Sequence, residues 1–399
     1  MPSFLINVAI SALRTFARRF LCSCGGGTES NGSPLDPAQE VVDIVIVGGG
    51  VIGLCIAYNL AKEREKAVTS VRWNITVLEA RDSVFAAASS HNTGCLHYDF
   101  HDSFGSNLIP LGRYSFEQWQ SIAMNDAQFS SDTGCRPQSF FPITPGASGG
   151  DEEEDLPNWI KMEKDWVVDW GSKGPVNATV TSTTIVAASL TKSGTIQGIK
   201  CASSKSGDTY SFPCQKLILA AGPWTPSQVK TLFPDSTLDL RPSTNAGDWV
   251  IFQNPNPMND KTTAVVFFDD IVRSWNMPGG TMEDEPNEEV IVALLRYSER
   301  FIRRSRDSSE KRAVQLQVKE KGRAFRPFTE PGLPIISAIP ARQLVPSSSS
   351  RTRSVPSNVF ICFGHGSYGV TLGMGSGKLM AQVVRGETPD IDLTKFTLE

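Results

Sequence analysis

The sequence has no excess of basic residues and no long apolar run. Lys and Arg number 38 against 42 Asp and Glu, which gives a formal net charge of -4. Nucleic-acid-binding surfaces are usually basic and interleaved with aromatic residues, so we expect no nucleic-acid partner. No segment reaches the roughly 18 to 20 apolar residues that a membrane helix needs, so we expect no transmembrane span. The composition, 399 residues of which 40% are hydrophobic, is that of a globular chain of about two to three domains.

Cysteine is also scarce, and its spacing is not that of a zinc site. The chain has 8 Cys, none of them in a C-x-x-C pair, which indicates a reduced compartment without a structural zinc site. His91, His97 and His101 are close together in the sequence. The residues Asn92–Gly94 indicate a loop, however, and not the helix that a histidine pair at i, i+4 needs. We therefore predict no metal site.

The N-terminal segment contains no acidic side chain from Met1 to Thr28. Its charge comes from Arg14, Arg18 and Arg19, and polar residues recur at helical spacing opposite an apolar face. Such an arginine-bearing amphipathic helix is typical of organelle transit peptides. The alternatives are a surface-lying anchor and a tail without a targeting role. We expect residues 1–40 to be a targeting segment and a linker, and the protein to be mitochondrial, with a plastid or the cytoplasm as the other locations.

A buried strand followed by a glycine-rich turn opens the folded part of the chain. The run Val41–Val47 is continuous and β-branched, as expected of a parallel strand. Gly48, Gly50 and Gly53 follow in G-x-G-x-x-G spacing, and a helix is expected to about Glu65. In this context the glycines permit a tight turn, close approach of a pyrophosphate and close helix packing, with the helix N-terminus facing the phosphates. The pattern predicts a dinucleotide site; the alternative is a glycine turn without a nucleotide.

Later segments favour FAD over NAD as the dinucleotide. The predicted strand Asn74–Leu78 ends in Glu79, an acid placed to accept ribose hydroxyls. Lys216–Ala221 is another predicted buried strand and ends in Gly222, and Asn358–Phe363 runs into a glycine-rich turn and a helix. This second strand-glycine-helix unit offers a second helix N-terminus, which a long cofactor such as FAD can use.

Six motifs, in order along the chain, carry a resemblance to a known family. They are IVGGGVIGL, VLEAR, ASSHNTGCLH, LILAAGPW, FRPFTEPGLPIIS and GHGSYGVTLGMGSGKL. Together they resemble the D-amino-acid oxidase superfamily of FAD-dependent oxidoreductases, over nearly everything after Val41. The resemblance implies an α/β fold, in which a doubly wound, Rossmann-type FAD-binding domain is interleaved with a mixed-sheet substrate domain. The FAD domain would comprise residues 41–105, 180–230 and 350–399, and the substrate domain residues 106–179 and 231–349.

The resemblance also assigns contacts to the cofactor FAD. The expected cofactor-binding residues are Gly48, Gly50, Val51, Ile52, Gly53, Glu79, Ala80, Arg81, Ser90, His91, Asn92, Thr93, Gly94, Ala221, Gly222, Gly364, His365, Gly366, Ser367, Tyr368, Gly369, Val370 and Thr371. Backbone amides at the start of the last helix would face the flavin N1 and C2=O, with Gly373, Gly375 and Gly377 allowing close approach. His91 stands where some members carry a flavin-linked histidine. The HNTG sequence also resembles L-2-hydroxyglutarate dehydrogenases, so a covalent link and a hydrogen-bonding role both stay open.

Arg326 is the residue that the resemblance places against the substrate. A planar guanidinium suits a carboxylate, and the arginine of this motif binds the substrate carboxylate in glycine-oxidase-like relatives; a surface ion pair is the alternative. We expect an FAD-dependent oxidoreductase that oxidises a small carboxylated amine or a 2-hydroxy acid by hydride transfer to flavin N5. A hydroxy acid needs a base to take its hydroxyl proton, and His97 or His365 could serve.

Two other functions stay open on the sequence. One is an L-2-hydroxyglutarate-type dehydrogenase, which the HNTG sequence and His97 favour. The other is a flavin-binding assembly or trafficking factor without turnover, which the irregular region 123–178 favours because a substrate pocket there would be remodelled. The electron acceptor is oxygen, a quinone or an electron-transfer protein. The serine-rich run Ser347–Ser354 is expected to be a surface loop.

Overall fold

The structure is a computed structural model of the chain. It describes residues 4–7, 40–66, 71–92, 95–98, 105–127, 129, 136–143, 183–241, 245–253, 263–267, 275–276, 285–299, 316–345 and 356–398. The chain divides into two compact units. The smaller unit comprises Met1–Asn7, Arg136–Gly171 and Thr244–Phe325, and the larger comprises Val8–Cys135, Ser172–Ser243 and Arg326–Glu399.

A mainly parallel sheet forms the centre of the larger unit. Its strand order is β14-β15-β9-β2-β3, and only β14 is antiparallel to its neighbour. The strands are β2 (Glu40–Val47), β3 (Val71–Leu78), β9 (Lys216–Leu219), β14 (Ile335–Ala338) and β15 (Val359–Phe363). The four parallel strands confirm the predicted strands and the α/β fold class. Their β-branched and aliphatic residues are explained by burial of both sheet faces.

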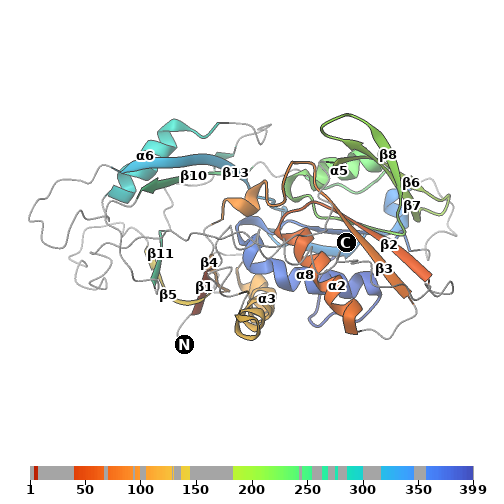
Figure 1. Ribbon diagram of the computed structural model, residues 1–399, viewed down its shortest axis with the longest axis horizontal. Helices are drawn as coiled ribbons and strands as arrows, with labels where there is room; N and C mark the ends of the chain where they lie inside the picture. The colour runs from red at the N-terminus through yellow and green to blue at the C-terminus, as the bar shows by residue number, and fades with distance from the viewer. Residues whose placement is uncertain are drawn as a thin grey trace, which may run out of the picture. The chain divides into compact units, whose positions relative to one another are not determined.

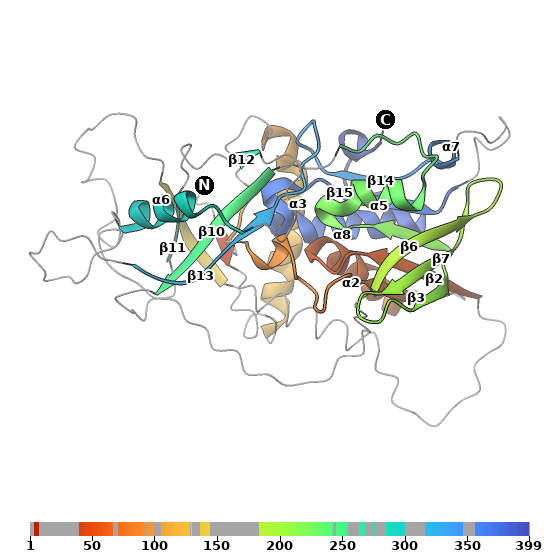
Figure 2. The same cartoon turned by 90° about the horizontal axis from the view of Figure 1, so that it is seen from above.

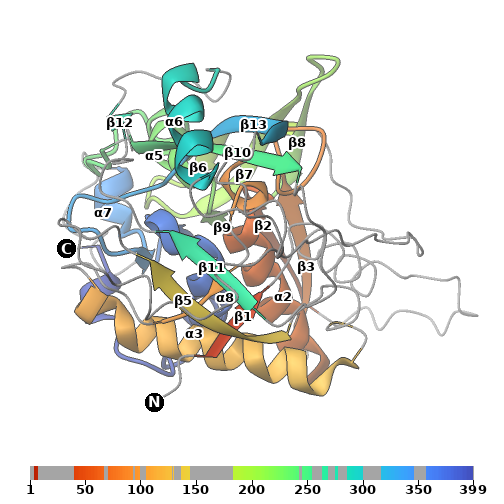
Figure 3. The same cartoon turned by 90° about the vertical axis from the view of Figure 1, so that its left-hand side faces the viewer.

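Helices cover one face of this sheet. α2 (Val51–Lys66) and α8 (Gly369–Arg385) start shortly after β2 and β15 and pack against each other (Figure 1). α3 (Gly105–Asn125), seen lengthwise in Figure 3, packs against α8. Ile46 of β2 points into this layer, because an ideal Cβ on Gly53 of α2 would lie 3.3 Å from Ile46 Cγ2. The starts of α2 and α8 therefore lie at the carboxyl edge of the same parallel sheet.

Three glycines of α8 serve this helix packing, which corrects the expectation that they allow close approach of the cofactor. An ideal Cβ on Gly377 would lie 2.5 Å from the backbone carbonyl carbon of Cys55 in α2. One on Gly375 would lie 2.7 Å from the Cβ of Ser115 in α3, and one on Gly373 would also contact α2. Small residues are required here because three helices meet. A glycine pattern in the sequence does not show whether it serves such helix packing or the approach of a ligand.

A three-stranded antiparallel sheet and a helix cover the opposite face (Figure 2). These elements are β6 (Thr183–Leu190), β7 (Ile196–Ser203), β8 (Thr209–Pro213) and α5 (Thr225–Leu232). They share one buried core with alternate residues of the central strands. The central strands contribute Val45, Val47, Leu217, Leu219, Val359 and Ile361, and the covering elements contribute Ile185, Ile199 and Val229. The sequence did not predict this sheet as an outer layer.

Short elements complete the larger unit. They are β4 (Cys95–Leu96), α7 (Ala341–Leu344) and the 3-10 helices Ala88–Ser90, Gly222–Trp224, Gly366–Tyr368 and Thr394–Phe396. None of the helices that the structure describes is long and apolar enough to cross a membrane.

The smaller unit contains two sheets and a helix. β10 (Asn245–Gln253) lies between β12 (Trp275–Asn276) and β13 (Gln317–Phe325), antiparallel to both, and α6 (Glu288–Glu299) packs on β10. In the other sheet β5 (Arg136–Ile143) is antiparallel to β1 (Phe4–Asn7) and parallel to β11 (Thr263–Phe267). Part of the region expected to be irregular is therefore a strand, and residues 144–182 lie outside the described residues.

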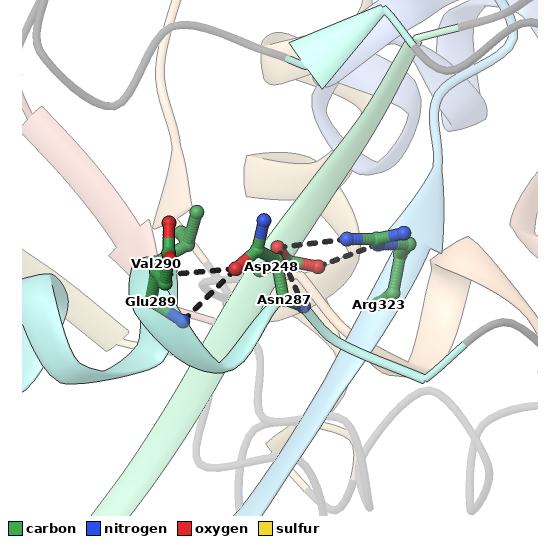
Figure 4. A network of polar contacts seen from close by, with 5 residues as sticks. All are labelled: Asp248, Asn287, Glu289, Val290 and Arg323. Carbon is green, nitrogen blue, oxygen red and sulfur yellow. Dashed lines mark hydrogen bonds and ion pairs between the residues drawn. The ribbon is translucent and has the colours of Figure 1, made fainter.

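A buried ion pair joins β10 to β13. Arg323 Nε donates to Asp248 Oδ1 at 2.6 Å and Arg323 Nη2 to Oδ2 at 3.1 Å, and the side chains are only 6% and 2% exposed. The Asn287 backbone N–H donates to the same carboxylate at 3.2 Å, while its side-chain oxygen accepts the amides of Glu289 and Val290 at the start of α6 (Figure 4). The Asp248 carboxylate thus connects both strands with the N-terminus of α6, and these bonds compensate for its burial.

The helix predicted near the N-terminus is wrong where the structure describes it. Phe4–Asn7 form strand β1, with Phe4 opposite Ser139 and Asn7 opposite Arg136 of β5. Four residues are too few for periodicity to separate a strand from a helix. The rest of the predicted helix, the linker and Ser347–Ser354 lie outside the described residues.

The predicted domain boundaries stay a prediction. Three elements in the ranges assigned to the substrate domain lie instead in the larger unit with the parallel sheet: α3, α7 and β14, which pairs with β15.

Candidate functional site

The glycine-rich turn between β2 and α2 contains two glycines that packing requires. Gly48 has a φ of +112°, and an ideal Cβ there would lie 2.3 Å from the Ala220 carbonyl oxygen. An ideal Cβ on Gly53 would lie 2.0 Å from the Gly48 carbonyl oxygen. The first glycine therefore lets the turn approach the end of β9, and the third lets α2 approach the turn, as the G-x-G-x-x-G spacing predicts.

Gly50 differs from these two glycines. An ideal Cβ on Gly50 would have one near neighbour, Ser89 Oγ at 3.3 Å. The Val51 N–H at the start of α2 donates to the same hydroxyl at 3.0 Å, and the first turn of α2, which includes Ile52, has no acidic residue. Space, amide donors and a positive helix end are what a pyrophosphate requires. The turn therefore fits the nucleotide that the sequence predicts.

Glu79 lies at the end of β3 beside this turn. Its Oε2 accepts the Gly49 N–H at 2.8 Å, and its Oε1 accepts the Arg81 N–H at 3.0 Å. A carboxylate has about four acceptor positions, so both oxygens keep capacity for further donors such as ribose hydroxyls. The neighbouring Ala80 carbonyl accepts the Ser204 hydroxyl at 3.0 Å, which attaches this segment to the outer sheet.

The loop after β3 returns to the glycine turn. Phe85 is buried with a left-handed φ of 56° and donates its N–H to the Gly49 carbonyl at 3.0 Å. Ser90 is buried and its hydroxyl donates to the Ala87 carbonyl at 2.8 Å, so its role here is within the loop. His91 and Asn92 are half-buried in the same loop, with the Asn92 side chain donating to the Ser89 carbonyl at 2.6 Å. Thr93 and Gly94 lie outside the described residues.

Ser89 and Phe85 are site residues that the sequence did not identify. Ser89 lies 38 positions along the chain from its partner Val51. Phe85 likewise contacts Gly49 of the turn from a distant part of the sequence. The two serines of ASSHN are equivalent in the sequence, and only the fold distinguishes Ser89, at the start of α2, from Ser90. A non-glycine residue in the left-handed region costs of order 1 kcal/mol or more and concentrates at functional sites.

The turn after β9 also faces this edge. The Ala220 N–H donates to the Val47 carbonyl at 2.8 Å, which holds the end of β9 against the end of β2. Gly222 follows Ala221 with a φ of +54°, and nothing described lies within 4 Å of its ideal Cβ. The free space beside Gly222 agrees with the predicted cofactor contact.

The loop between β15 and α8 packs on the segment after β13. Gly366 has a φ of +55°, its N–H donates to the Pro327 carbonyl at 2.9 Å, and an ideal Cβ would lie 2.5 Å from the ring of Phe328. Gly364 has a φ of +92°, and its ideal Cβ would lie 2.3 Å from Thr329 Cγ2. These two glycines bring Arg326, the neighbour of Pro327, to the loop that precedes α8.

The N-terminus of α8 carries no capping side chain. Tyr368 occupies the N-cap position and its side chain does not cap the helix, and the first turn from Gly369 through Val370 and Thr371 contains no acidic residue. Ser367 before it is exposed. An uncapped helix start leaves amide donors for another partner, as the predicted contact with the flavin requires.

Arg326, Tyr368 and His97 come together beside this helix start. Burial lowers the pKa of Arg326, and the nearby Tyr368 acts in the opposite direction because it favours the charged guanidinium. The ring of His97 meets the ring of Tyr368 edge-on, with centroids 6.2 Å apart. Tyr368 thus lies near both the half-buried guanidinium and the imidazole, which brings a group able to bind a small anion and a group able to exchange a proton to the same side chain.

His365 is placed differently from His97. It is 3% exposed, its Nε2 lies 3.0 Å from Ser376 Oγ, and burial lowers its pKa to about 3. Its Nδ1 has no hydrogen-bond partner among the described residues. The imidazole is therefore neutral near pH 7, and a base at this buried position has less access to substrate than His97. A catalytic role for either histidine stays a prediction.

Within the described ranges, no three His, Cys, Asp or Glu side chains are grouped to hold a metal ion.

Comparison with known proteins identifies the family. The model of the family described as FAD dependent oxidoreductase matches residues 43–178 and 176–383. The chain belongs to this family of FAD-dependent oxidoreductases. No curated protein matches the sequence.

Several solved structures have a fold similar to that of this chain. The chain resembles a glycine oxidase from Geobacillus kaustophilus with a TM-score of 0.57 and 19% identity, covering 90% of this chain and 99% of that one. It resembles an L-proline dehydrogenase from P. horikoshii with a TM-score of 0.61 and 14% identity (90% and 97% covered). It also resembles an iminodiacetate oxidase from Chelativorans sp. BNC1 with a TM-score of 0.56 and 15% identity (89% and 98% covered).

The residues at the carboxyl edge fit FAD, the cofactor of the family. The space beside Gly50, the open left-handed position of Gly222 and the uncapped start of α8 are three separate features along this edge. The adenine dinucleotide would be held by the Gly48–Gly53 turn, the start of α2 and Glu79, and the flavin by the start of α8. The chain is thus an FAD-dependent oxidoreductase with two helix N-termini directed at one edge of its sheet.

Proposed function

We propose that the protein oxidises a small amine bearing a carboxylate, an α-amino acid or a close relative. The observation that carries this proposal is the half-buried guanidinium of Arg326, which lies near Tyr368 at the loop before α8, with His97 against the same tyrosine ring. A planar guanidinium at the cofactor edge is suited to binding a carboxylate, because the two carboxylate oxygens can accept its parallel N–H groups.

The names of the similar structures support this substrate class. Glycine oxidase, L-proline dehydrogenase and iminodiacetate oxidase are named for molecules that carry both an amine and a carboxylate. Their identities to this chain are below 20%, so the support rests mainly on the position of Arg326 in this chain.

The cofactor and the residues of the site would have separate roles in the reaction. When bound, FAD supplies the two-electron acceptor for the oxidation. Arg326 binds the substrate carboxylate and fixes the orientation of the carbon to be oxidised, which removes much of the entropic cost of the reaction. Tyr368 lies near the guanidinium and favours its charged form. An amine that enters neutral leaves no proton for the protein to remove before oxidation.

A 2-hydroxy acid is the second candidate substrate, as in an L-2-hydroxyglutarate-type dehydrogenase. Oxidation of an alcohol requires a base for the hydroxyl proton. His97 favours this candidate because its ring lies edge-on to Tyr368, close to the predicted carboxylate anchor. The electron acceptor in either case is proposed to be oxygen, a quinone or an electron-transfer protein.

A substrate screen on the purified flavoprotein tests the proposal. Anaerobic mixing with a panel of amino acids and 2-hydroxy acids should bleach the flavin absorbance with at least one amino acid. Bleaching by a 2-hydroxy acid alone would select the second candidate. Full retention of colour with every compound would instead favour a flavin-binding factor without turnover.

Arg326→Met then tests the anchor with the substrate found. Removal of one partner of a desolvated charge pair costs about 2–5 kcal/mol, so kcat/KM should fall about thirtyfold to several thousandfold. Arg326→Lys should recover part of this, since an ammonium lacks the two-pronged geometry. Arg241→Met is the matched control, because Arg241 pairs with Glu330 on the surface. Normal turnover by Arg326→Met would require another carboxylate anchor.

A further inference from the structure

The contact between α3 and α8 contains an unusual hydrogen bond. Ser115 of α3 is fully buried, and its hydroxyl donates to the Thr371 carbonyl at 2.6 Å while accepting the Gly375 N–H at 2.7 Å. In a regular helix the Gly375 N–H would donate directly to the Thr371 carbonyl four residues earlier. The Ser115 hydroxyl therefore stands between donor and acceptor, within the hydrogen-bond ladder of another helix.

Two neighbouring features maintain this insertion. Gly375 has no side chain, and an ideal Cβ at that position would lie 2.7 Å from the Ser115 Cβ and 2.9 Å from its Cα. One turn further along α3, the buried Trp119 donates its Nε1–H to the Val370 carbonyl at 3.0 Å. Side chains of α3 thus bind two consecutive carbonyls in the first turn of α8.

These carbonyls belong to the turn on which cofactor binding depends. The first turn of α8 has no capping side chain of its own, so contacts with other elements fix its direction. A side chain inserted into the ladder separates the two ends of one helical bond and tilts the turn locally. The tilt determines where the amide groups at the start of α8 point.

We propose that Ser115 is a positioning residue of the flavin site. Its hydroxyl, between Thr371 and Gly375, sets the orientation of the first turn of α8, so that the amides of that turn meet the bound flavin. Trp119 supports the same turn through Val370. The proposal rests on FAD binding and not on the identity of the substrate.

The experiment replaces the inserted hydroxyl in the full-length protein. Ser115→Ala allows Gly375 and Thr371 to bond directly, and Ser115→Cys keeps a group of similar size that donates and accepts weakly. Trp119→Phe removes the donor to Val370 and keeps an aromatic ring. Ser121→Ala is the control on the same helix, since Ser121 is exposed. Ile199→Val is the control for stability, because it removes one buried methyl from the other face of the sheet.

The measured quantities are the FAD dissociation constant and the midpoint potential of the bound flavin. For Ser115→Ala we expect the dissociation constant of oxidised FAD to rise several-fold and that of reduced FAD about tenfold more, because helix amides stabilise the negative charge of the reduced form. A tenfold difference lowers a two-electron potential by about 30 mV. Ser115→Cys should show an intermediate value and Trp119→Phe a shift in the same direction.

Equal potentials in Ser115→Ala and Ile199→Val would overturn the proposal, because a purely structural role lowers stability without changing the potential. If Ser115→Ala does not fold, unchanged potentials in both Ser115→Cys and Trp119→Phe overturn it as well. None of these measurements uses a substrate. The proposed substrate class can therefore fail while this inference stands, and the reverse also holds.

Discussion

Two glycines of the same turn should respond in opposite ways to an added side chain. Gly50→Val places methyl groups where an ideal Cβ has only Ser89 Oγ nearby, at 3.3 Å, and the φ of Gly50 is not left-handed. Gly53→Ala places a single methyl group 2.0 Å from the Gly48 carbonyl oxygen. The larger side chain should therefore damage cofactor binding, and the smaller one should damage the fold.

The magnitudes follow from these contacts. Gly50 is half-buried, and a Cβ there requires only a small shift of the Ser89 hydroxyl, so apo Gly50→Val should lose less stability than Gly53→Ala. Its branched side chain fills the space of a pyrophosphate, and we expect FAD affinity to fall at least about a hundredfold, or about 2.7 kcal/mol. Overpacking of a rigid backbone contact costs about 1–3 kcal/mol or more, which applies to Gly53→Ala.

The assay separates the two effects by measuring stability without the cofactor. Bound FAD itself stabilises the folded state, so urea unfolding is measured on protein stripped of flavin, and affinity by titration with FAD. The reasoning is refuted if Gly50→Val purifies with a full complement of flavin, or if it loses as much apo stability as Gly53→Ala. Colourless wild-type protein that fails to bind added FAD would contradict the assignment of this edge as the cofactor site.

Three further predictions concern the ion pair, a buried histidine and the N-terminus. Asp248→Asn leaves Arg323 buried without its charged partner and should lower the free energy of unfolding by about 3–5 kcal/mol; Glu330→Gln, which breaks an exposed pair with Arg241, should cost less than about 1 kcal/mol. Urea unfolding checks both, and equal losses would contradict the role of burial. Burial lowers the pKa of His365 to about 3, below the unfolded value of about 6.5, so the unfolded state binds a proton first as pH falls. Stability should then decline from about pH 6.5 toward pH 3 by up to about 1.4 kcal/mol per unit, and His365→Gln should flatten that slope. Residues 1–40 fused to a fluorescent reporter should enter mitochondria; a diffuse signal would leave the segment without a targeting role.

The central strands and their following helices could be predicted because their signals are local. The β-branched run before Gly48 and the run before Gly364 each combine a buried strand with a glycine turn, and both are strands of the parallel sheet. The position of β14 could not be predicted in the same way. Its four residues, Ile335–Ala338, join the sheet through antiparallel pairing with β15, a long-range contact that no local pattern records.

The candidate site shows the same division. Gly48, Gly53 and Glu79 lie where the dinucleotide spacing predicts, since each function depends on nearby backbone geometry. Ser89 was not predicted because its role depends on a hydrogen bond with Val51, a residue distant in the sequence. Arg326 was predicted from the family resemblance. The position of Tyr368 near Arg326 and against the His97 ring appears only in the fold, which brings three separate segments together.

The glycines of α8 explain why this helix can leave its N-terminus available. A missing cap costs a helix about 1 kcal/mol, and α8 has no capping side chain. Its stability must come from elsewhere, and Gly375 and Gly377 permit backbone-level contact with Ser115 of α3 and Cys55 of α2. Close packing along the body of the helix thus offsets the uncapped end. A substitution that improved the cap at Tyr368 would be expected to stabilise the apo protein and to compete with FAD for the same amides.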